Sequence, residues 1–256
     1  MNKPPILYKY RPFNTNTISC LLNKEIFFSD PDRFNDPFDS EYSLNLPSNI
    51  LNRAMDYANK LVLNEMEKRS PKEATWIRVA LLDIIRQNDE DYLKYYLVKI
   101  LANLRLFNKI NIGIYSMSSI NNNILMWSHY ARNHTGICIG FDSNIHPFSN
   151  AQNVSYTNQY YQFNSKTFKN KKYVLEPFLR KSSHWRYEKE YRIISEEGGG
   201  LIQFNPKAIK RIYFGCRSSN HTIKMVQLLV SKYPQKIYLY KLEKSLSKYT
   251  LIASKV

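Results

Sequence analysis

The sequence changes its residue periodicity twice, and this feature constrains the fold more than any other. Within residues 48–107, apolar residues recur at helical spacing behind a cap at Ser48 and a second start at Ser70-Pro71, which predicts three consecutive helices. Short aromatic and β-branched runs stand on both sides of this block. We therefore predict an α+β fold: residues 1–256 form a single domain with a mixed, mostly antiparallel β core, and residues 48–107 form an all-helical insertion. A doubly wound parallel sheet is the alternative, which the lack of regular β-α-β alternation disfavours.

The β core is predicted from short apolar or aromatic runs that end at turn-forming residues. The predicted strands are 6–10, 25–29, 111–117, 136–142, 186–195, 209–214 and 237–240. A connection is expected between the first two. Two helices accompany the later strands, one capped by Asn123 and one over residues 222–232.

The chain is strongly basic, with a formal net charge of +16. After Leu201 it holds many Lys and Arg residues but a single acid, Glu243. Such an asymmetry indicates a polyanionic partner, either nucleic acid or an acidic protein surface. The chain is also rich in Lys, Asn, Ile and Tyr, which A/T-rich codons supply, so genomic drift is the alternative source of the charge.

The cysteines and the apolar runs indicate a cytoplasmic protein. Cys20, Cys138 and Cys216 are far apart and form no C-x-x-C pair, which gives no support for a disulfide framework or a zinc site. The N-terminus has no apolar segment of signal-peptide length, and no run approaches the roughly 18 apolar residues of a membrane span. We expect no membrane association.

The densest group of charged residues lies in 185–192. If this segment is a strand, Glu188 and Glu190 share a face with Arg186 and Arg192, because alternate residues point the same way. One interpretation is a solvated face of ion pairs. The other is a carboxylate that binds a ribose hydroxyl or stabilises a cationic transition state, with its ionisation maintained by the neighbouring arginine.

A second group of candidate residues lies in the helix after Asn123. His129 can exchange protons near neutral pH, and Trp127 or Tyr130 can stack on a flat ring. Helical Trp and Tyr residues are also common core anchors. His129 and His134 are five positions apart, which is a poor spacing for metal ligands on one helix, so no metal site is predicted.

The first predicted strand alternates aromatic and basic residues. Tyr8 and Tyr10 fall on one face and Lys9 and Arg11 on the other, a pattern that suits an aromatic clamp or a phosphate contact, and equally an ordinary edge strand.

The segment 30–39 contains prolines with turn-forming Asp and Asn residues, which predicts an ordered loop whose polar groups, Asn35 and Asp36 among them, are presented to a ligand. The chain has no glycine-rich phosphate loop, H-E-x-x-H helix or G-x-S-x-G elbow, which argues against the enzyme classes built on these motifs.

Several strings resemble, in order, the motifs of a bacterial domain-of-unknown-function family: L-Y-K-Y, F-N-D-P-F-D, M-W-S-H-Y-A and W-x-Y-E-x-E-Y-R. This resemblance covers nearly the whole chain apart from the predicted helical insertion, and it implies no particular activity.

The opening L-Y-K strand and the late E-x-E strand also resemble, less closely, the ADP-ribosyltransferases. This resemblance implies that NAD is the substrate, that Tyr8 to Tyr10 face the nicotinamide riboside, and that Glu190 is the catalytic glutamate with Glu188 as the upstream acid. The first strand departs from the histidine-first pattern, since it carries Lys9 and Tyr10. Tyr115 and Tyr130 are both candidates for the middle tyrosine motif.

The function that this resemblance implies is an NAD-dependent ADP-ribosyltransferase or NAD glycohydrolase, of the kind found among toxins and anti-phage effectors, acting on nucleic acid or an associated target. Arg11 or Arg192 would hold the pyrophosphate, Trp127 or a tyrosine would stack on nicotinamide, and a protein partner could neutralise the activity.

Two other functions remain open from the sequence. One is a nucleic-acid-binding module without catalysis, in which the two glutamates only balance the arginines. The other is a magnesium-dependent nuclease that uses the carboxylates of Asp36, Asp39, Glu188 and Glu190.

Overall fold

The computed structural model describes residues 3–44, 112–163 and 175–256. The chain divides into two compact units, one made of residues 1–40, 112–159 and 178–256 and the other of 41–111 and 160–177. The predicted helical insertion at 48–107 lies outside the described residues. Among the described helices, none is long and apolar enough to cross a membrane.

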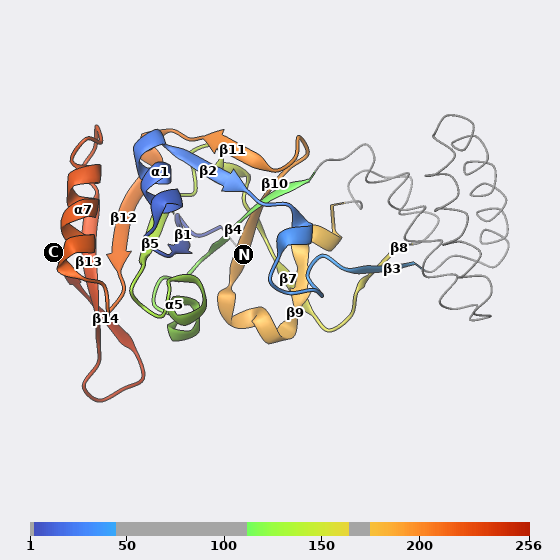
Figure 1. Ribbon diagram of the computed structural model, residues 1–256. Helices are drawn as coiled ribbons and strands as arrows, with labels where there is room; N and C mark the ends of the chain where they lie inside the picture. The colour runs from blue at the N-terminus through green and yellow to red at the C-terminus, as the bar shows by residue number, and fades with distance from the viewer. Residues whose placement is uncertain (1–2, 45–111, 164–174) are drawn as a thin grey trace, which may run out of the picture. The chain divides into compact units, whose positions relative to one another are not determined.

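The first unit is built on an eight-stranded sheet with the order β14-β13-β12-β5-β1-β4-β10-β6 (Figure 1). Every neighbouring pair is antiparallel except β12 and β13, which are parallel. The strands are β1 (Ile6–Arg11), β4 (Gly113–Ser118), β5 (Ile137–Asp142), β6 (Gln152–Asn153), β10 (Glu190–Ser195), β12 (Ile209–Phe214), β13 (Tyr238–Lys244) and β14 (Leu251–Lys255). This arrangement confirms the α+β class and the mostly antiparallel core.

The described residues also contain shorter strand pairs, three α-helices and short 3₁₀ helices. The α-helices are α1 (Thr15–Asn23), α5 (Ile124–Tyr130) and α7 (Asn220–Val230). In the first unit, β2 (Glu25–Phe28) pairs with β11 (Gly200–Gln203), and β7 (Ser155–Thr157) pairs with β9 (Arg180–Ser182). In the second unit, β3 (Tyr42–Leu44) pairs with β8 (Tyr161–Phe163).

Each helix begins at a polar cap, as expected for the backbone N–H groups that its first turn leaves without partners. The side chains of Asn14, Asn123 and Ser219 accept hydrogen bonds from the backbone N–H groups of Thr17, Met126 and Thr222, respectively. The cap predicted at Asn123 is therefore confirmed.

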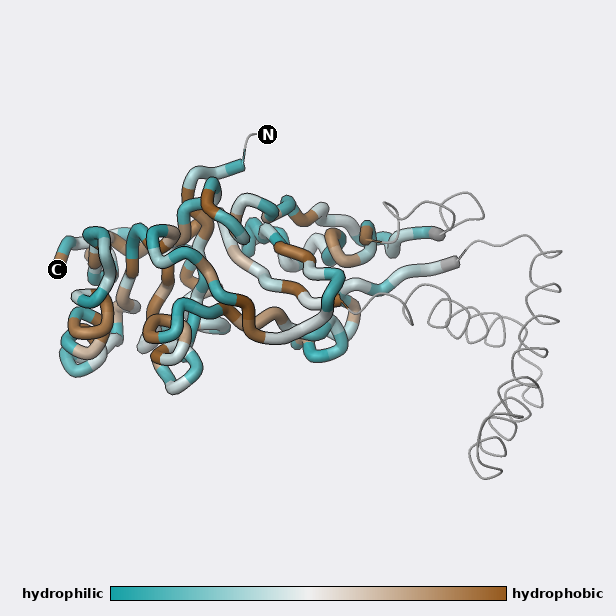
Figure 2. The backbone as a smooth tube through the Cα atoms, turned by 90° about the horizontal axis from the view of Figure 1, so that it is seen from above, coloured by the Kyte–Doolittle hydropathy of each residue, from teal (hydrophilic) through white to brown (hydrophobic). Residues whose placement is uncertain are grey.

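Alternation along the strands separates two apolar clusters on opposite faces of the large sheet. On β5, Ile137 and Ile139 belong to the larger cluster with residues of α1 and α7, whereas Cys138 belongs to the smaller cluster with Trp127 of α5. Likewise Ile212 of β12 faces the larger cluster and Tyr213 the smaller one. Figure 2 shows apolar residues in brown recurring between polar residues in teal along this unit. The sheet is thus covered by α1 and α7 on one face and by α5 on the other.

Several described segments differ from the sequence predictions, including the short strands β3, β6, β9 and β11, which no predicted strand covers. The connection expected between the first two strands contains helix α1, and the C-terminal strand β14 was not predicted. The strand expected over 186–195 is only Glu190–Ser195, because residues Ser183–Glu188 form a 3₁₀ helix that ends at Lys189 with a φ of 46°. The 3₁₀ segment carries alternating charged and aromatic residues, so its sequence imitates a strand.

The large sheet opens between β1 and β4, which share a single register pair, Tyr8 with Ser118. By contrast, β1 pairs with β5 over its whole length. Lys9 compensates in part, because its Nζ donates a hydrogen bond to the backbone carbonyl of Ser116 on β4 at 2.6 Å. The candidate site lies at this opening.

Candidate active site

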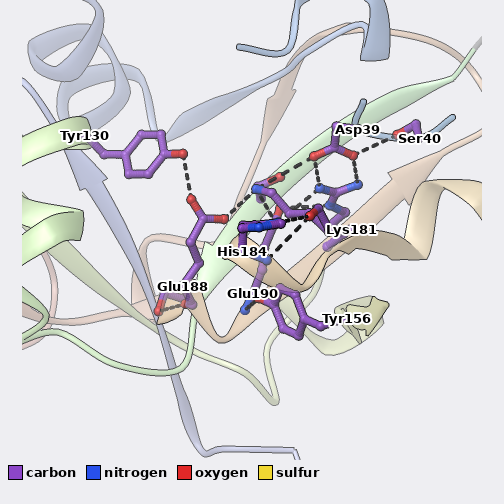
Figure 3. A network of polar contacts seen from close by, with 12 residues as sticks. Asp39, Ser40, Tyr130, Tyr156, Lys181, His184, Glu188 and Glu190 are labelled. Carbon is purple, nitrogen blue, oxygen red and sulfur yellow. Dashed lines mark hydrogen bonds and ion pairs between the residues drawn. The ribbon is translucent and has the colours of Figure 1, made fainter. Parts of the chain in front are cut away.

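An open pocket of about 550 Å³ lies where β1 and β4 separate. Its walls come from β1, β4 and β10, from the segment around Phe34 and Asp39, from α5, and from the 3₁₀ helix before β10. A volume of this size falls within the range usual for small-molecule sites. Its polar wall contains ionised groups, which Figure 3 shows converging from these separate segments.

Glu190 is buried in the wall of this pocket, with 4% of its surface exposed. Arg192 donates from Nε to Oε1 at 2.8 Å and from Nη2 to Oε2 at 3.1 Å, and Lys181 Nζ donates to Oε2 at 3.1 Å. Burial alone would raise the pKa of Glu190, but the charges of Arg192 and Lys181 outweigh it and hold this pKa well below the usual range. Glu190 is therefore an ionised carboxylate that is buried in the pocket wall.

Arg192 is anchored from a second side by Asp39. Its Nη1 and Nη2 donate to the two carboxylate oxygens of Asp39 at 2.8 Å and 2.6 Å, and Nη1 also donates to the backbone carbonyl of Phe178 at 2.9 Å. The guanidinium carbon lies 5.3 Å from the ring centre of Phe34. The bidentate interaction with Asp39 fixes the plane of the Arg192 guanidinium, and the guanidinium in turn fixes the position of Glu190.

Glu188 is the second buried carboxylate, with 3% of its surface exposed. Lys181 Nζ donates to its Oε2 at 2.5 Å, and the hydroxyl of Tyr130 donates to its Oε1 at 2.6 Å (Figure 3). Burial raises the pKa of Glu188 and the charge of Glu190 adds to this, while Lys181 acts in the opposite direction. The two carboxylates therefore have pKa values shifted in opposite directions, an arrangement typical of sites that move protons.

Lys181 links the whole cluster. Its Nζ lies 2.5 Å from Glu188, 3.1 Å from Glu190 and 3.7 Å from Asp39, and 5.0 Å from the ring centre of Trp185. Burial would lower the pKa of Lys181, but the surrounding carboxylates raise it above its usual range. Three carboxylates thus surround two cations, Lys181 and Arg192, which leaves one net negative charge if all five are ionised.

The chain brings the two glutamates together by a turn rather than by alternation within one strand. Glu188 ends the 3₁₀ helix and Glu190 begins β10, while Lys189 between them adopts a left-handed conformation. The turn is held by Ser118, whose Oγ donates to the carbonyl of Glu188 at 2.6 Å, and by the phenol of Tyr156, which accepts from the backbone N–H of Glu190 at 2.7 Å.

The comparisons bear on this part of the chain. Residues 126–193 match the model of a family described as a protein of unknown function (DUF2971). This match supports the resemblance to a domain-of-unknown-function family. Comparisons with curated proteins and with solved structures gave no significant match.

The segment matched by the DUF2971 model contains most of the charged cluster. Tyr130, Lys181, Glu188, Glu190 and Arg192 all lie within it, whereas Asp39 and strand β1 lie outside. The family model therefore covers the two glutamates together with the cations that bind them.

Most of the site residues predicted from the sequence line this one pocket. They are Tyr8, Lys9, Tyr10, Asn35, His129, Tyr130, Glu188, Glu190 and Arg192. His129 is exposed at the rim. Burial and the charge of Arg11 lower the pKa of Lys9 to about 8, against the opposing effect of the glutamates.

Three predicted site residues do not line the pocket. Arg11 points to the backbone carbonyl of Asn16 at 3.5 Å, and Asp36 uses its carboxylate to accept the backbone N–H of Phe38 at 3.0 Å. Trp127 is completely buried, and its Nε1 donates to the carbonyl of Asn121 at 2.8 Å. Trp127 is thus a core anchor, the alternative that the sequence left open.

Arg186, expected to share a face with the glutamates, is exposed and lies 3.5 Å from the carbonyl of Tyr156.

Sequence reasoning missed Lys181 and gave Asp39 only a metal-binding role. Lys181 stands in a short strand with no recognisable motif, and its partners Asp39 and Glu188 come from other segments. Among the described residues, no group of three potential ligands is arranged to hold a metal ion. The ammonium of Lys181 lies among Asp39, Glu188 and Glu190, which are three of the four carboxylates that the magnesium-dependent nuclease alternative uses.

Proposed function

We propose that the pocket binds NAD and cleaves the bond between nicotinamide and ribose, transferring ADP-ribose to an acceptor or to water. The observation that carries this proposal is the pair of buried carboxylates on the pocket wall, Glu190 with a lowered pKa and Glu188 with a raised one. The resemblance of the L-Y-K and E-x-E strands to the ADP-ribosyltransferases agrees with their arrangement, since β1 and β10 both border β4 at the opening.

Glu190 supplies the fixed negative charge that this reaction needs. As the C–N bond breaks, its electron pair leaves with nicotinamide and the ribose acquires oxocarbenium character. A preorganised carboxylate near the ribose, accepting a hydrogen bond from the 2′-hydroxyl, is worth more in this transition state than in the ground state. Arg192 and Lys181 keep Glu190 ionised and in place.

Glu188 takes the proton of the incoming acceptor. The acceptor oxygen or nitrogen forms a bond to the ribose carbon, and its proton passes to Glu188, whose raised pKa suits it as a base nearer neutral pH. The products are nicotinamide and an ADP-ribosylated acceptor, or free ADP-ribose if the acceptor is water. Tyr130 orients the carboxylate of Glu188 by its hydrogen bond to Oε1.

The aromatic contact to nicotinamide is reassigned from Trp127 to pocket residues. Tyr8, Tyr130 and Trp185 line the pocket, whereas Trp127 is enclosed in the core. Of the two candidates for the middle tyrosine, Tyr130 lines the pocket and Tyr115 packs beneath it against Phe28 and Phe148. The net charge of +16 favours a polyanionic acceptor such as nucleic acid. A role as a toxin or defence effector with a neutralising partner stays a prediction.

The test is nicotinamide release from NAD by purified protein, with and without nucleic acid. We expect release by the wild type, a loss of about 100-fold or more in Glu190→Gln, and normal release in Glu197→Gln, which changes an exposed glutamate beyond the site. Because Glu190→Gln also disturbs Arg192, circular dichroism and a direct NAD-binding measurement accompany the rates. Failure of the wild type to bind NAD, or release that survives Glu190→Gln, would overturn the proposal.

A further inference from the structure

A row of tyrosines crosses the large sheet from the pocket toward its C-terminal edge. The ring centres of Tyr8 and Tyr213 are 6.0 Å apart, and those of Tyr213 and Tyr240 are 4.9 Å apart with nearly parallel planes. Gly140 of β5 lies between the first two, and a Cβ atom there would come within 3.1 Å of the Tyr8 ring. A side chain at Gly140 would therefore crowd the ring of Tyr8.

Cations accompany the exposed part of this row. Tyr238, with 43% of its surface exposed, pairs in register with Arg211 of β12, so both side chains share the face that carries Tyr8 and Tyr240. The Nζ atoms of Lys236 and Lys255 each lie 5.7 Å from the ring centre of Tyr238. Arg211 is itself exposed.

Acids are scarce on the same face. Beyond Leu201 the sequence has one acid, Glu243, which alternation on β13 places on the opposite face from Tyr240. Asp142 at the end of β5 is paired with Lys210 at 3.4 Å. We call the surface formed by Tyr8, Arg211, Tyr213, Tyr238, Tyr240 and Lys255 the tyrosine strip.

We propose that the tyrosine strip binds single-stranded nucleic acid and leads it to the edge of the pocket at Tyr8. Tyr238 is exposed and Tyr8 and Tyr240 are half-buried, whereas Tyr213 is buried and supports its neighbours. Accessible rings flanked by cations suit a strand whose bases are unpaired, because bases can stack on them while Arg211, Lys236 and Lys255 contact phosphates. A duplex hides the faces of its bases, and an acidic protein offers charge without flat rings. The strip deepens the proposed function by naming its acceptor class, but its binding does not depend on catalysis.

The experiment measures the affinity of a fluorescent oligonucleotide of about 12 nucleotides, within the site sizes of known single-strand binders. DNA and RNA strands and the matching duplex are compared by anisotropy over a series of salt concentrations. Tyr238→Leu keeps an apolar side chain but removes the ring, and Arg211→Gln removes one charge. Matched controls are Tyr249→Leu, at an exposed tyrosine of the β13–β14 hairpin, and Lys224→Gln, at an exposed lysine on α7.

We expect Tyr238→Leu to bind a single strand about tenfold more weakly, and Arg211→Gln to reduce the slope of log affinity against log salt by about 0.7. The two controls should stay within about twofold of the wild type. Duplex binding as tight as single-strand binding, strip variants that behave like the controls, or equal competition by polyglutamate would each overturn the proposal.

The outcomes for the strip and for the reaction are separable. Glu190→Gln should bind the oligonucleotide as the wild type does, because Glu190 lies in the pocket rather than on the strip. If strip variants lose oligonucleotide binding while no protein releases nicotinamide, the strip stands and the proposed reaction falls. If nicotinamide is released but no strand binds, the reaction stands and the strip falls.

Discussion

Lys181 and Glu188 bind each other inside the pocket wall, with Nζ 2.5 Å from Oε2 and side chains that are 6% and 3% exposed. Neither group could be buried alone at reasonable cost, because an isolated charge loses its hydration without compensation. Each therefore depends on the other, and Asp39 and Glu190 depend on the same ammonium. The stability of the fold and the charge state of the site are consequently set by the same contacts.

Removal of Lys181 should destabilise the protein strongly. Lys181→Met leaves buried carboxylates without their shared cation, and we expect the free energy of unfolding to fall by about 3–5 kcal/mol. The exposed Lys224 on α7 provides the control, since Lys224→Met should change it by about 0.5 kcal/mol or less. Urea unfolding followed by circular dichroism measures both. Equal effects of the two substitutions would contradict the buried cluster.

Replacement of Arg192 should lower the free energy of unfolding far more than replacement of Arg186, although the two arginines flank the same glutamates in the sequence. Arg192 is 1% exposed and binds both Asp39 and Glu190, so Arg192→Met should cost about 3–5 kcal/mol of unfolding free energy. Arg186 is exposed, and Arg186→Met should cost about 0.5 kcal/mol or less. Thermal and urea unfolding of the pair checks this. Similar losses would indicate the continuous strand that the sequence suggested.

The pH dependence of nicotinamide release should report the ionisation of Glu188. The folded-state pKa of Glu188 is raised, so its protonated form favours folding at low pH, and this contribution is lost as the pH rises through that pKa. A base must be ionised, so release should increase over the same range. Tyr130→Phe removes a hydrogen bond that lowers the pKa of Glu188, and it should shift the acidic limb to higher pH.

Tyr10→Phe is the control for this shift, because the hydroxyl of Tyr10 donates to the carbonyl of Ile120 and not to a carboxylate. Its acidic limb should coincide with that of the wild type. A Tyr130→Phe profile with an unmoved or lowered limb would show that Glu188 does not control the rate. Carboxyl NMR of the labelled glutamates provides a check that does not need activity.

Lys9 should produce a stability gain at alkaline pH. Its pKa falls from 10.5 to about 8 in the folded protein, so the unfolded chain binds more protons between these values. Stability contributed by Lys9 therefore rises as the pH increases from about 8 to 10.5. The difference in unfolding free energy between wild type and Lys9→Met, measured across this range, should show that slope. Lys224→Met should retain the wild-type slope, and a flat difference for Lys9→Met would refute the prediction.

Substitution of Trp127 should reduce mainly the stability of the fold, and substitution of Trp185 should reduce mainly NAD binding. Trp127 is fully buried, and Trp127→Ala should lower the free energy of unfolding by about 3–5 kcal/mol. Trp185 is half-buried at the pocket, so Trp185→Ala should weaken NAD binding more than it weakens the fold. Calorimetric titration with NAD and urea unfolding of both variants separate the two effects. If Trp127→Ala stayed folded but lost NAD binding while Trp185→Ala kept it, the two roles would have to be exchanged.

The sequence was most informative where a contact is local. The strand predicted over 136–142 and the cap at Asn123 follow from neighbouring residues, and the structure confirms both, with β5 at Ile137–Asp142. The prediction that Glu188 and Glu190 lie close together is confirmed, but the geometry on which it rested is wrong. A left-handed Lys189, and not a continuous strand, brings the two carboxylates together.

Contacts between distant segments could not be predicted in the same way. Lys181 meets Asp39 across more than a hundred positions of sequence, and no periodicity connects them. The sequence left both a ligand platform and a core anchor open for Trp127, with the core anchor as the commoner role of a helical Trp. Its burial depends on how α5 packs against β1, which only the three-dimensional arrangement fixes.

Because β1 and β4 share a single register pair, the large sheet is divided into two parts that are joined weakly at this point. On one side stand β4, β10 and β6 with the ionised groups of β10, and on the other stand β1, β5, β12, β13 and β14 with the tyrosine strip. A molecule bound in the pocket at this opening would contact β1 on one side and β4 and β10 on the other. Ligand binding there would add contacts between two parts of the sheet that are otherwise joined by one register pair.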